Sequence, residues 1–510
     1  MKRNIYRIKS LGGTIRTGFA FIGCKIAFIL CLILFSACHT DEMDSETHKQ
    51  LKFYLNGNLV ESVIPEATET EFTLVVESKN SWSLTCQEEW IKTSIATGEA
   101  GNTPIVVTVD ENSGGDARVA KLLFAMKNGA TESLSIAQTG SLDPVGSDEY
   151  RFYVTFGTIP TLYSGLHLLS HDGPSFFGYE RTGTFDPSFF PSHVSYIPGS
   201  DNPEDLLVMG EVMKKEILKI NNRDKEAKFV LYVDDLRCRL GYDWFVAQGI
   251  DSSRVEVNMW SDGTATYNNF YNFFGSNSNA ESNWNRIATE VEALNWNTSA
   301  QTRGVPEQFN SSEWPYYMST LPNYRLLLHD KNLLETENSF IQNKVAEMNA
   351  VSVSPEEMLK ALSPGNQQRF FKMCNFDKAH YSEMFDVSAK PNLVIIGTNG
   401  NAEQQNYVKR VYDQYAGTHD IFYKPHPADA TCAEYETLFP GLKLLPGRMP
   451  FEVFVWSLMD QIDVLGGFES TVFLTVPVNK VKFILGKSNA SELIKPLNKM
   501  FENASVEYIH

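Results

Sequence analysis

The chain has 510 residues, of which 43% are hydrophobic and 21% are charged. That composition is typical of globular domains and excludes a largely disordered, collagen-like or coiled-coil protein; the length allows two to four domains at roughly 150 residues each. Seven cysteines are too few for a disulfide scaffold. The formal net charge of −18 argues against nonspecific nucleic-acid binding, because that requires a basic surface to displace counterions.

The first 37 residues have the features of a secretion signal. They contain six lysines and arginines and no acidic residue, and they include an apolar run over residues 26–35. That run is too short to span a bilayer, which takes about 20 residues. Small residues precede Cys38 and resemble the cleavage site of bacterial lipoproteins. We therefore predict a cleaved signal at 1–37, a lipid on Cys38 and export to the outer membrane; a plain signal peptide is the alternative.

Residues 51–141 follow a linker at 38–50 and alternate apolar and polar positions in short runs. Examples are residues 72–76, 105–109 and 134–137, and turn-rich stretches separate the runs. Period-two alternation in short runs predicts an all-β sandwich.

Several details of this segment resemble the BACON family: Trp82, Trp90, the turn at Asn112, Arg118 and the closing residues 137–140. Modules of that family are immunoglobulin-like and are often attached to carbohydrate-active proteins. The two tryptophans fit either the core of a sandwich or a platform for a sugar ring. We expect the segment to be a spacer rather than a lectin.

After a polar linker at 141–148, strand-like runs alternate with helix-like runs, which predicts parallel sheets with crossover helices. We predict two α/β lobes, at 150–390 and 391–490, and a C-terminal tail at 491–510. The first lobe should hold strands at 151–156, 228–233 and 254–260, a helix at 204–220 and a mostly helical stretch at 313–385. The second should hold strands at 392–396, 420–423, 462–465 and 480–485, with helices at 402–415 and 451–459.

Ligands of such sheets bind beyond the carboxyl ends of the strands, and small polar residues occupy two of these positions in the second lobe. Thr398, Asn399 and Gly400 follow one strand, and two glycines followed by Ser470 and Thr471 come after another, where we expect an apolar helix to begin. Backbone N–H groups and hydroxyls at such positions can hold a phosphate. An ordinary turn and an ordinary helix cap are the alternatives.

Charged and titratable residues occupy two further positions of this lobe. His426 lies between two prolines, the second of which is Pro427, and directly follows Lys424 and Pro425. An imidazole held there can donate a proton or a hydrogen bond to a leaving phosphate. Glu452, near the start of a predicted helix, can accept the hydroxyls of a ribose. A core or capping histidine and a charge that complements a helix terminus are the alternatives.

Acidic residues end two predicted strands of the first lobe. Asp262 precedes Gly263 after one strand, and Asp234 and Asp235 end another. An aspartate at this edge of a sheet can serve as a general base or as a turn residue. No Asp-x-Asp triplet and no HExxH motif occurs, so we predict no metal site.

Taken in chain order, these segments resemble bacterial sialyltransferases of glycosyltransferase family 80. The matching positions are a first loop containing Thr158 and Pro160, Asp262-Gly263 in an acidic-acidic-glycine motif, a helical middle at 362–377, His426-Pro427, Glu452, and Ser470-Thr471 after two glycines. Ser261 replaces the first acid of that motif, and Thr471 stands where serine is commoner.

The resemblance implies a two-lobed GT-B fold, a double Rossmann-like arrangement, behind the immunoglobulin-like sandwich. It also implies an inverting transfer of sialic acid from CMP-sialic acid to a galactoside hydroxyl, without a metal or a cofactor other than the donor. Asp262 would take the acceptor's proton, and His426 would stabilise or protonate the departing phosphate. Contacts to the donor would come from Thr398, Asn399, Gly400, Lys424, Pro427, Glu452, Ser470 and Thr471, and contacts to the acceptor from Thr158, Pro160, Asp234 and Asp235.

Two departures leave the acceptor and the linkage open. A tryptophan that the family often has is missing from the loop at 398–400, and Asp234-Asp235 stand where its first-lobe acceptor histidine is expected. One alternative is a noncatalytic, surface glycan-binding lipoprotein, because nucleotide sugars are made in the cytoplasm whereas Cys38 implies export. Another is a transferase that uses a different CMP-sugar, such as CMP-Kdo.

Overall fold

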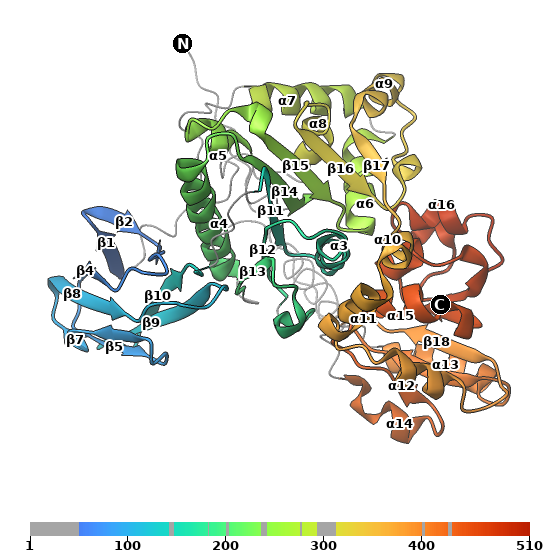
Figure 1. Cartoon of the computed structure of the whole chain (residues 1–510). Helices are drawn as coiled ribbons and strands as arrows, with labels where there is room; N and C mark the ends of the chain where they lie inside the picture. The colour runs from blue at the N-terminus through green and yellow to red at the C-terminus, as the bar shows by residue number, and fades with distance from the viewer. Residues whose placement is uncertain are drawn as a thin grey trace, which may run out of the picture.

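The computed structural model describes residues 50–141, 147–181, 183–199, 203–235, 242–275, 278–292, 313–399, 403–426 and 431–510. It forms three parts, a β-sandwich and two α/β lobes (Figure 1). The predicted signal segment, Cys38 and the linker that follows it lie outside the described residues, as do Gly400 and Pro427. No helix in the described part of the chain is long and apolar enough to cross a membrane.

The β-sandwich consists of two five-stranded sheets around a shared apolar core. The predicted runs at 72–76, 105–109 and 134–137 form strands β4 (Glu71–Ser78), β8 (Gly101–Val109) and β10 (Thr131–Gln138). Trp82 is 3% exposed and packs edge-on against Phe124 at 5.4 Å between ring centroids, and the Arg118 guanidinium lies 4.2 Å from the ring centroid of half-buried Trp90. One sheet has the order β2 (Asn58–Val60), β1 (Leu51–Leu55), β4 (Glu71–Ser78), β8 (Gly101–Val109), β6 (Ile91–Thr93), and the other β3 (Ser62–Val63), β10 (Thr131–Gln138), β9 (Arg118–Met126), β5 (Trp82–Cys86), β7 (Thr97–Gly98).

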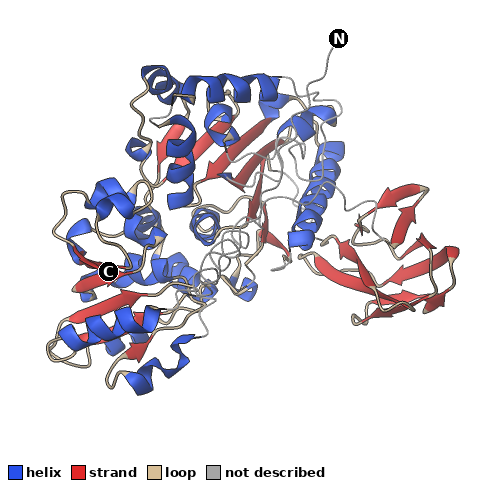
Figure 2. Ribbon diagram, turned by 180° about the vertical axis from the view of Figure 1, so that it is seen from behind, coloured by secondary structure: helices blue, strands red, loops and turns tan. Residues whose placement is uncertain are grey.

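The first lobe is built on seven parallel strands in the residues that the structure describes there. Their order is β13 (Val194–Ile197), β12 (Ser175–Tyr179), β11 (Glu149–Thr155), β14 (Lys228–Asp234), β15 (Val255–Trp260), β16 (Tyr324–Leu328), β17 (Ala350–Ser352). Helices cover the sheet (Figure 2): α3 (Thr158–Leu168), α4 (Pro203–Arg223), α5 (Tyr242–Ala247), α6 (Thr264–Phe274), α7 (Ala280–Glu292), α8 (Trp314–Met318) and α9 (Ser339–Glu347). The stretch predicted as mostly helical therefore also supplies two strands, β16 and β17.

The second lobe holds a six-stranded parallel sheet within residues 392–510. Its order is β20 (Lys443–Leu444), β19 (Asp420–Lys424), β18 (Asn392–Ile396), β21 (Val464–Gly467), β22 (Val481–Leu485), β23 (Glu507–Ile509), with helices α13 (Gln404–Tyr415), α14 (Tyr435–Leu438), α15 (Phe451–Leu458) and α16 (Leu497–Phe501). The prediction of a separate tail after residue 490 is wrong, because β23 pairs with β22 and extends the sheet.

Three helices join the two lobes: α10 (Pro355–Ala361), α11 (Pro364–Met373) and α12 (Lys378–Phe385). The first two begin with a serine followed by proline. Ser354 Oγ accepts from Glu357 N at 3.2 Å, and Ser363 Oγ accepts from Asn366 N at 3.3 Å; proline has the right φ and no N–H to lose at this position. One apolar core continues from the first lobe into the second, so the lobes are packed directly against each other.

The β-sandwich docks on the outer strand of the first lobe, beside α4 (Figure 1). Ala117 N donates to Tyr196 O at 2.9 Å, Tyr196 N donates to Asp116 Oδ1 at 2.7 Å, and Ser195 Oγ donates to Gly115 O at 2.8 Å. These bonds satisfy backbone groups of β13, which is an edge strand. Buried Ala117 and Ala137 of the sandwich belong to the same core as the first lobe.

Candidate active site

The carboxyl ends of the two sheets meet where the loop after β15 touches the loop after β21. Thr264 Oγ1 lies 3.0 Å from Thr471 Oγ1, and a Cβ added at Gly263 would clash with the Thr471 side chain. Gly263 has a φ of 70°, which L side chains rarely adopt. The structure thus brings two predicted segments, Asp262-Gly263 and Ser470-Thr471, into one place.

Asp262 is half-buried and held on both sides by the first lobe. Its backbone N donates to Asp235 Oδ1 at 3.0 Å and to Thr266 Oγ1 at 3.0 Å. Its side chain lies so close to Gly157 that a Cβ there would clash with Asp262 Oδ1. Two hydrogen bonds of the Asp262 backbone N–H, together with the close contact between its carboxylate and Gly157, therefore fix the position of that carboxylate.

Three residues predicted to contact the acceptor are buried instead. Asp234 and Asp235 are 1% and 2% exposed; Asp234 Oδ2 accepts from Gly157 N at 2.9 Å, and Asp235 supports Asp262. Pro160 is buried in the first turn of α3, with its Cδ beside Gly157. Their contact with the acceptor stays a prediction. The sequence did not indicate their burial, because a strand-end position does not reveal whether a side chain turns outward or back under the loop.

Thr158 remains accessible at the start of α3, where a cation lies beside it. Arg181 Nη1 donates to Thr158 Oγ1 at 2.8 Å, and the charge of Arg181 also lowers the pKa of buried Glu452. The sequence analysis missed Arg181, although it follows the carboxyl end of β12 by two residues, because β12 itself was not predicted. Its five residues are all buried, so they lack the alternation that would have indicated a strand.

The Lys424 ammonium is turned into the protein. It is 5% exposed, and its Nζ donates to Pro425 O and Gly447 O at 2.8 Å each. Burial lowers its pKa to about 8, while the charge of Glu452 raises it. Lys424 therefore ties the segment that follows β19 to the loop at Gly447, and its contact with the donor stays a prediction.

His426 and Glu452 lie at the same edge of the second sheet, with different exposure. His426 is exposed just beyond β19. Glu452 is 8% exposed in the first turn of α15, and burial raises its pKa, while its own backbone N–H, Lys424 and Arg181 lower it. The Glu452 carboxylate is therefore surrounded by compensating groups from both lobes.

The remaining predicted donor contacts are partly occupied within the protein. Thr398 N donates to Gln404 Oε1 at 3.0 Å, and Asn399 is exposed. Ser470 Oγ accepts from Val472 N at 3.3 Å and thereby caps a short 3₁₀ turn, η8 (Thr471–Leu474), which stands where an apolar α-helix was predicted. Because the turn has only four residues, a helix dipole contributes little there. A phosphate at this position would therefore be held by the hydroxyls of Ser470 and Thr471.

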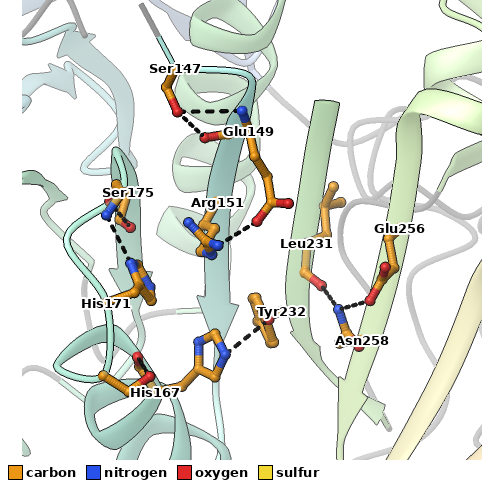
Figure 3. A network of polar contacts seen from close by, with 12 residues as sticks. Ser147, Glu149, Arg151, His167, His171, Ser175, Leu231, Tyr232, Glu256 and Asn258 are labelled. Carbon is orange, nitrogen blue, oxygen red and sulfur yellow. Dashed lines mark hydrogen bonds and ion pairs between the residues drawn. The ribbon is translucent and has the colours of Figure 1, made fainter. Parts of the chain in front are cut away.

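A second polar cluster lies at the opposite, amino-terminal edge of the first sheet. His171 Nδ1 accepts from Gly173 N at 3.1 Å, so its Nε2–H donates to Tyr153 Oη at 2.9 Å. Tyr153 then donates to His167 Nδ1 at 2.8 Å. His167 Nε2–H donates to Tyr232 Oη at 3.0 Å (Figure 3). Burial, and to a smaller extent the charge of Arg151, lowers the pKa of His167 to about 4 and that of His171 to about 3.

A cavity of about 400 Å³ adjoins this cluster, lined in part by His171, His193 and Arg369. It lies at the other end of the strands from Asp262 and is not the candidate active site. Among the residues that the structure describes, no group of three or more His, Cys, Asp or Glu side chains is arranged to hold a metal ion.

Residues 80–139 match the family model for BACON, described as a putative binding domain, N-terminal. This confirms the prediction made for the sandwich segment. The search of curated proteins gave no match.

The two α/β lobes have the fold of the GT-B domain of bacterial sialyltransferases. One similar solved structure is the 2,6-sialyltransferase of Photobacterium sp. JT-ISH-224 in a ternary complex with the donor product CMP and the acceptor substrate lactose; the identity is 16%, the TM-score is 0.54, and the match covers 88% of this chain and 95% of that one. The sialyltransferase of Photobacterium damsela is similar at 17% identity and a TM-score of 0.54, over 88% and 99% of the two chains.

An α/β-galactoside α-2,3-sialyltransferase of Photobacterium phosphoreum gives a TM-score of 0.53 at 19% identity, over 71% of this chain and 99% of that one. The family resemblance predicted from the motifs is thus confirmed at the level of the fold.

Proposed function

We propose that the protein is an inverting glycosyltransferase that moves sialic acid from CMP-sialic acid to a galactoside-type acceptor without a metal ion. The observation that carries this proposal is the junction of the two sheets. The loop of Asp262 in the first lobe touches Thr471 in the second, which puts a carboxylate base and two hydroxyls at one site.

In this mechanism the half-buried Asp262 takes the proton of the acceptor hydroxyl as that hydroxyl attacks the sugar. A positioned base typically accelerates such a step by about 10² to 10⁴. The leaving group is a phosphate ester, so its charge must be met by donors that are already in place. His426 and the hydroxyls of Ser470 and Thr471 have this role, and Glu452 receives the ribose hydroxyls.

Arg181 supplies the positive charge that the donor needs in an otherwise acidic protein. CMP-sialic acid is anionic, whereas the chain has a formal net charge of −18. The Lys424 ammonium is turned inward on two carbonyls, whereas Arg181 beside Thr158 is exposed and is a cation that can act at this edge.

The test is an assay of the full-length protein in detergent with CMP-sialic acid and lactose, in which sialyllactose and CMP are both quantified. We expect both products in equal amounts, and Asp262→Asn should reduce the rate at least a hundredfold. If the protein is inactive with CMP-sialic acid but transfers Kdo from CMP-Kdo and releases CMP, the proposed donor is wrong. If it releases no CMP and transfers no sugar with any CMP-sugar, the proposal that it is a transferase is refuted.

We also propose that Cys38 is lipidated and that the enzyme is exported to the outer membrane, where it would act on exported substrates. Metabolic labelling with an alkyne fatty acid should mark the protein and leave Cys38→Ser unmarked. The noncatalytic glycan binder is less favoured, because Trp82 is in the core of the sandwich and Arg118 covers Trp90.

A further inference from the structure

We propose that Asp235 is a positioning residue for Asp262: its two carboxylate oxygens hold the backbone of the base, one directly and one by way of Thr266. This inference rests on the proposed function, since it assigns Asp235 a part in the same proton transfer. Nothing in the sequence pattern distinguished Asp235 from a residue that contacts the acceptor.

Both carboxylate oxygens of Asp235 are used to fix the loop of Asp262. Oδ1 accepts from Asp262 N at 3.0 Å, and Oδ2 accepts from Thr266 Oγ1 at 2.6 Å. Thr266 Oγ1 in turn accepts from Asp262 N and from Ser261 Oγ, at 3.0 Å each. Asp262 N is thus shared between Asp235 and a hydroxyl that Asp235 orients, and a change at Asp235 alters both contacts.

The second contact region of Asp262 depends on the neighbouring residue of the same strand end. Asp234 Oδ2 accepts from Gly157 N at 2.9 Å, and Gly157 lies against Asp262 Oδ1. The two buried aspartates at the end of β14 therefore both support Asp262. Asp235 accepts from its backbone N–H, and Asp234 accepts from the N–H of Gly157, which the Asp262 carboxylate touches.

Other titratable groups surround Asp235. Asp234 on β14 and Asp262 after β15 affect its pKa, and Asp235 affects the pKa values of Tyr267 on α6 and Tyr316 on α8. Burial, together with Asp234 and Asp262, raises the pKa of Asp235 well above its usual range. A raised pKa favours the neutral form of a carboxyl group, so the positioning role follows from the two hydrogen bonds of Asp235 and not from a charge.

Asp235 offers one oxygen to Asp262 N and the other to the Thr266 hydroxyl. Asparagine would keep an oxygen for Asp262 N but would put an NH₂ group, which only donates, in place of the second oxygen. Alanine would remove both acceptors. The two variants therefore separate the loss of one contact from the loss of both.

The positioning part can be tested without any activity, by hydrogen exchange of the segment that contains residues 258–267. Asp235→Ala removes both acceptors, so we expect exchange at Asp262 and Gly263 to accelerate at least tenfold, whereas Asp235→Asn keeps an acceptor and should exchange like the wild type. Unchanged exchange in Asp235→Ala, with the fold intact by circular dichroism, would overturn the positioning role.

The consequence for the reaction is tested by the kinetics of sialyl transfer. Asp235→Ala should lower kcat about tenfold, because a displaced base slows the chemical step, with the KM for the donor unchanged. The matched control is Asp251→Ala, which removes an acid from an exposed turn of the same lobe and should change neither parameter.

A kcat that stays at the wild-type value in Asp235→Ala, or a loss of rate that appears only in the KM for the donor, would overturn the part of Asp235 in the reaction. If wild-type protein transfers no sugar, the proposed function fails, while hydrogen exchange still decides whether Asp235 positions Asp262.

Discussion

Gly157 is the residue whose missing side chain makes room for the proposed base. A Cβ at this position would clash with Asp262 Oδ1 and would also crowd Pro160 Cδ. Gly157→Ala should therefore displace the Asp262 carboxylate and lower kcat/KM about a hundredfold, since displacements of about 1 Å cost that much in positioned reactions. The control is Gly183→Ala in the same lobe, where nothing lies within 4 Å of an added Cβ; equal rates for the two variants would contradict the role.

Arg181 is the residue on which recognition of an anionic donor should depend. Arg181→Gln removes the charge beside Thr158 and Glu452, and a charge-assisted hydrogen bond is worth about 1.5–3 kcal/mol. We expect the KM for CMP-sialic acid to rise at least tenfold, with kcat within about threefold of wild type. Lys409→Gln, on exposed α13, controls for net charge, and a KM that does not change in Arg181→Gln would refute the assignment.

At the residue scale, the sequence predicts which residues reach the edge of a sheet but not which way they turn. The loop of Asp262 does meet Thr471, through Gly263 and Thr264. Lys424 and Asp235 occupy equivalent strand ends, yet both turn inward to bind backbone groups. The direction depends on which backbone donors or acceptors the neighbouring strand offers, and that neighbour is not adjacent in the sequence.

At the scale of elements, the histidine and tyrosine chain beneath α3 links stability to pH. The pKa of His167 is about 4 in the folded protein, against about 6.5 for an unperturbed histidine. The unfolded chain therefore binds more protons below about pH 6.5, and stability that is complete above that pH is lost as the pH falls toward 4. We expect His167→Gln to reduce this loss by on the order of 2 kcal/mol.

Urea denaturation at pH 7 and pH 5 would measure this effect. The control is His380→Gln, which removes an exposed histidine on α12 and should leave the pH dependence as it is in the wild type. A stability difference between the two pH values that is equal in all three proteins would show that His167 does not take up the proton.

Glu216 on α4 should make stability depend on pH in the opposite direction. Burial raises its pKa to about 7, and Glu66 of the sandwich raises it as well, while Lys219 lowers it. Its contribution to stability is present below about pH 4.5 and is lost as the pH rises through 7. Glu216→Gln should therefore stabilise the protein at pH 8 by about 2 kcal/mol and leave it unchanged at pH 4.5; Glu226→Gln, an exposed acid, should do neither in thermal unfolding.

The helices that sequence patterns predicted, such as α4 and α13, are long and have a clear period. Two of the strands that were missed, β17 and β23, are short and lie at sheet edges. β17 and β23 have three residues each, too few for a period to be recognised, and they become strands because a neighbouring strand supplies the hydrogen bonds. Pairing with a distant segment, rather than local propensity, defines them.

At the scale of the whole molecule, the β-sandwich packs directly against the first lobe and is not joined to it by the linker alone. It covers the edge strand β13 with three hydrogen bonds and contributes Ala117 and Ala137 to the core of the lobe. The predicted spacer thus has a structural consequence: part of the stability of the first sheet depends on residues before position 141.

Ala137→Leu tests this coupling, because the side chain of Ala137 is 0% exposed in the core that the sandwich shares with the first lobe. Overpacking there costs about 1–3 kcal/mol, and part of that cost should appear outside the sandwich. We expect faster hydrogen exchange in β13 and a lower urea midpoint for the whole chain. Ala125→Leu, which adds the same atoms on the exposed face of β9, should change neither. If β13 exchanges at the wild-type rate in Ala137→Leu while the sandwich itself loosens, the two parts are energetically independent.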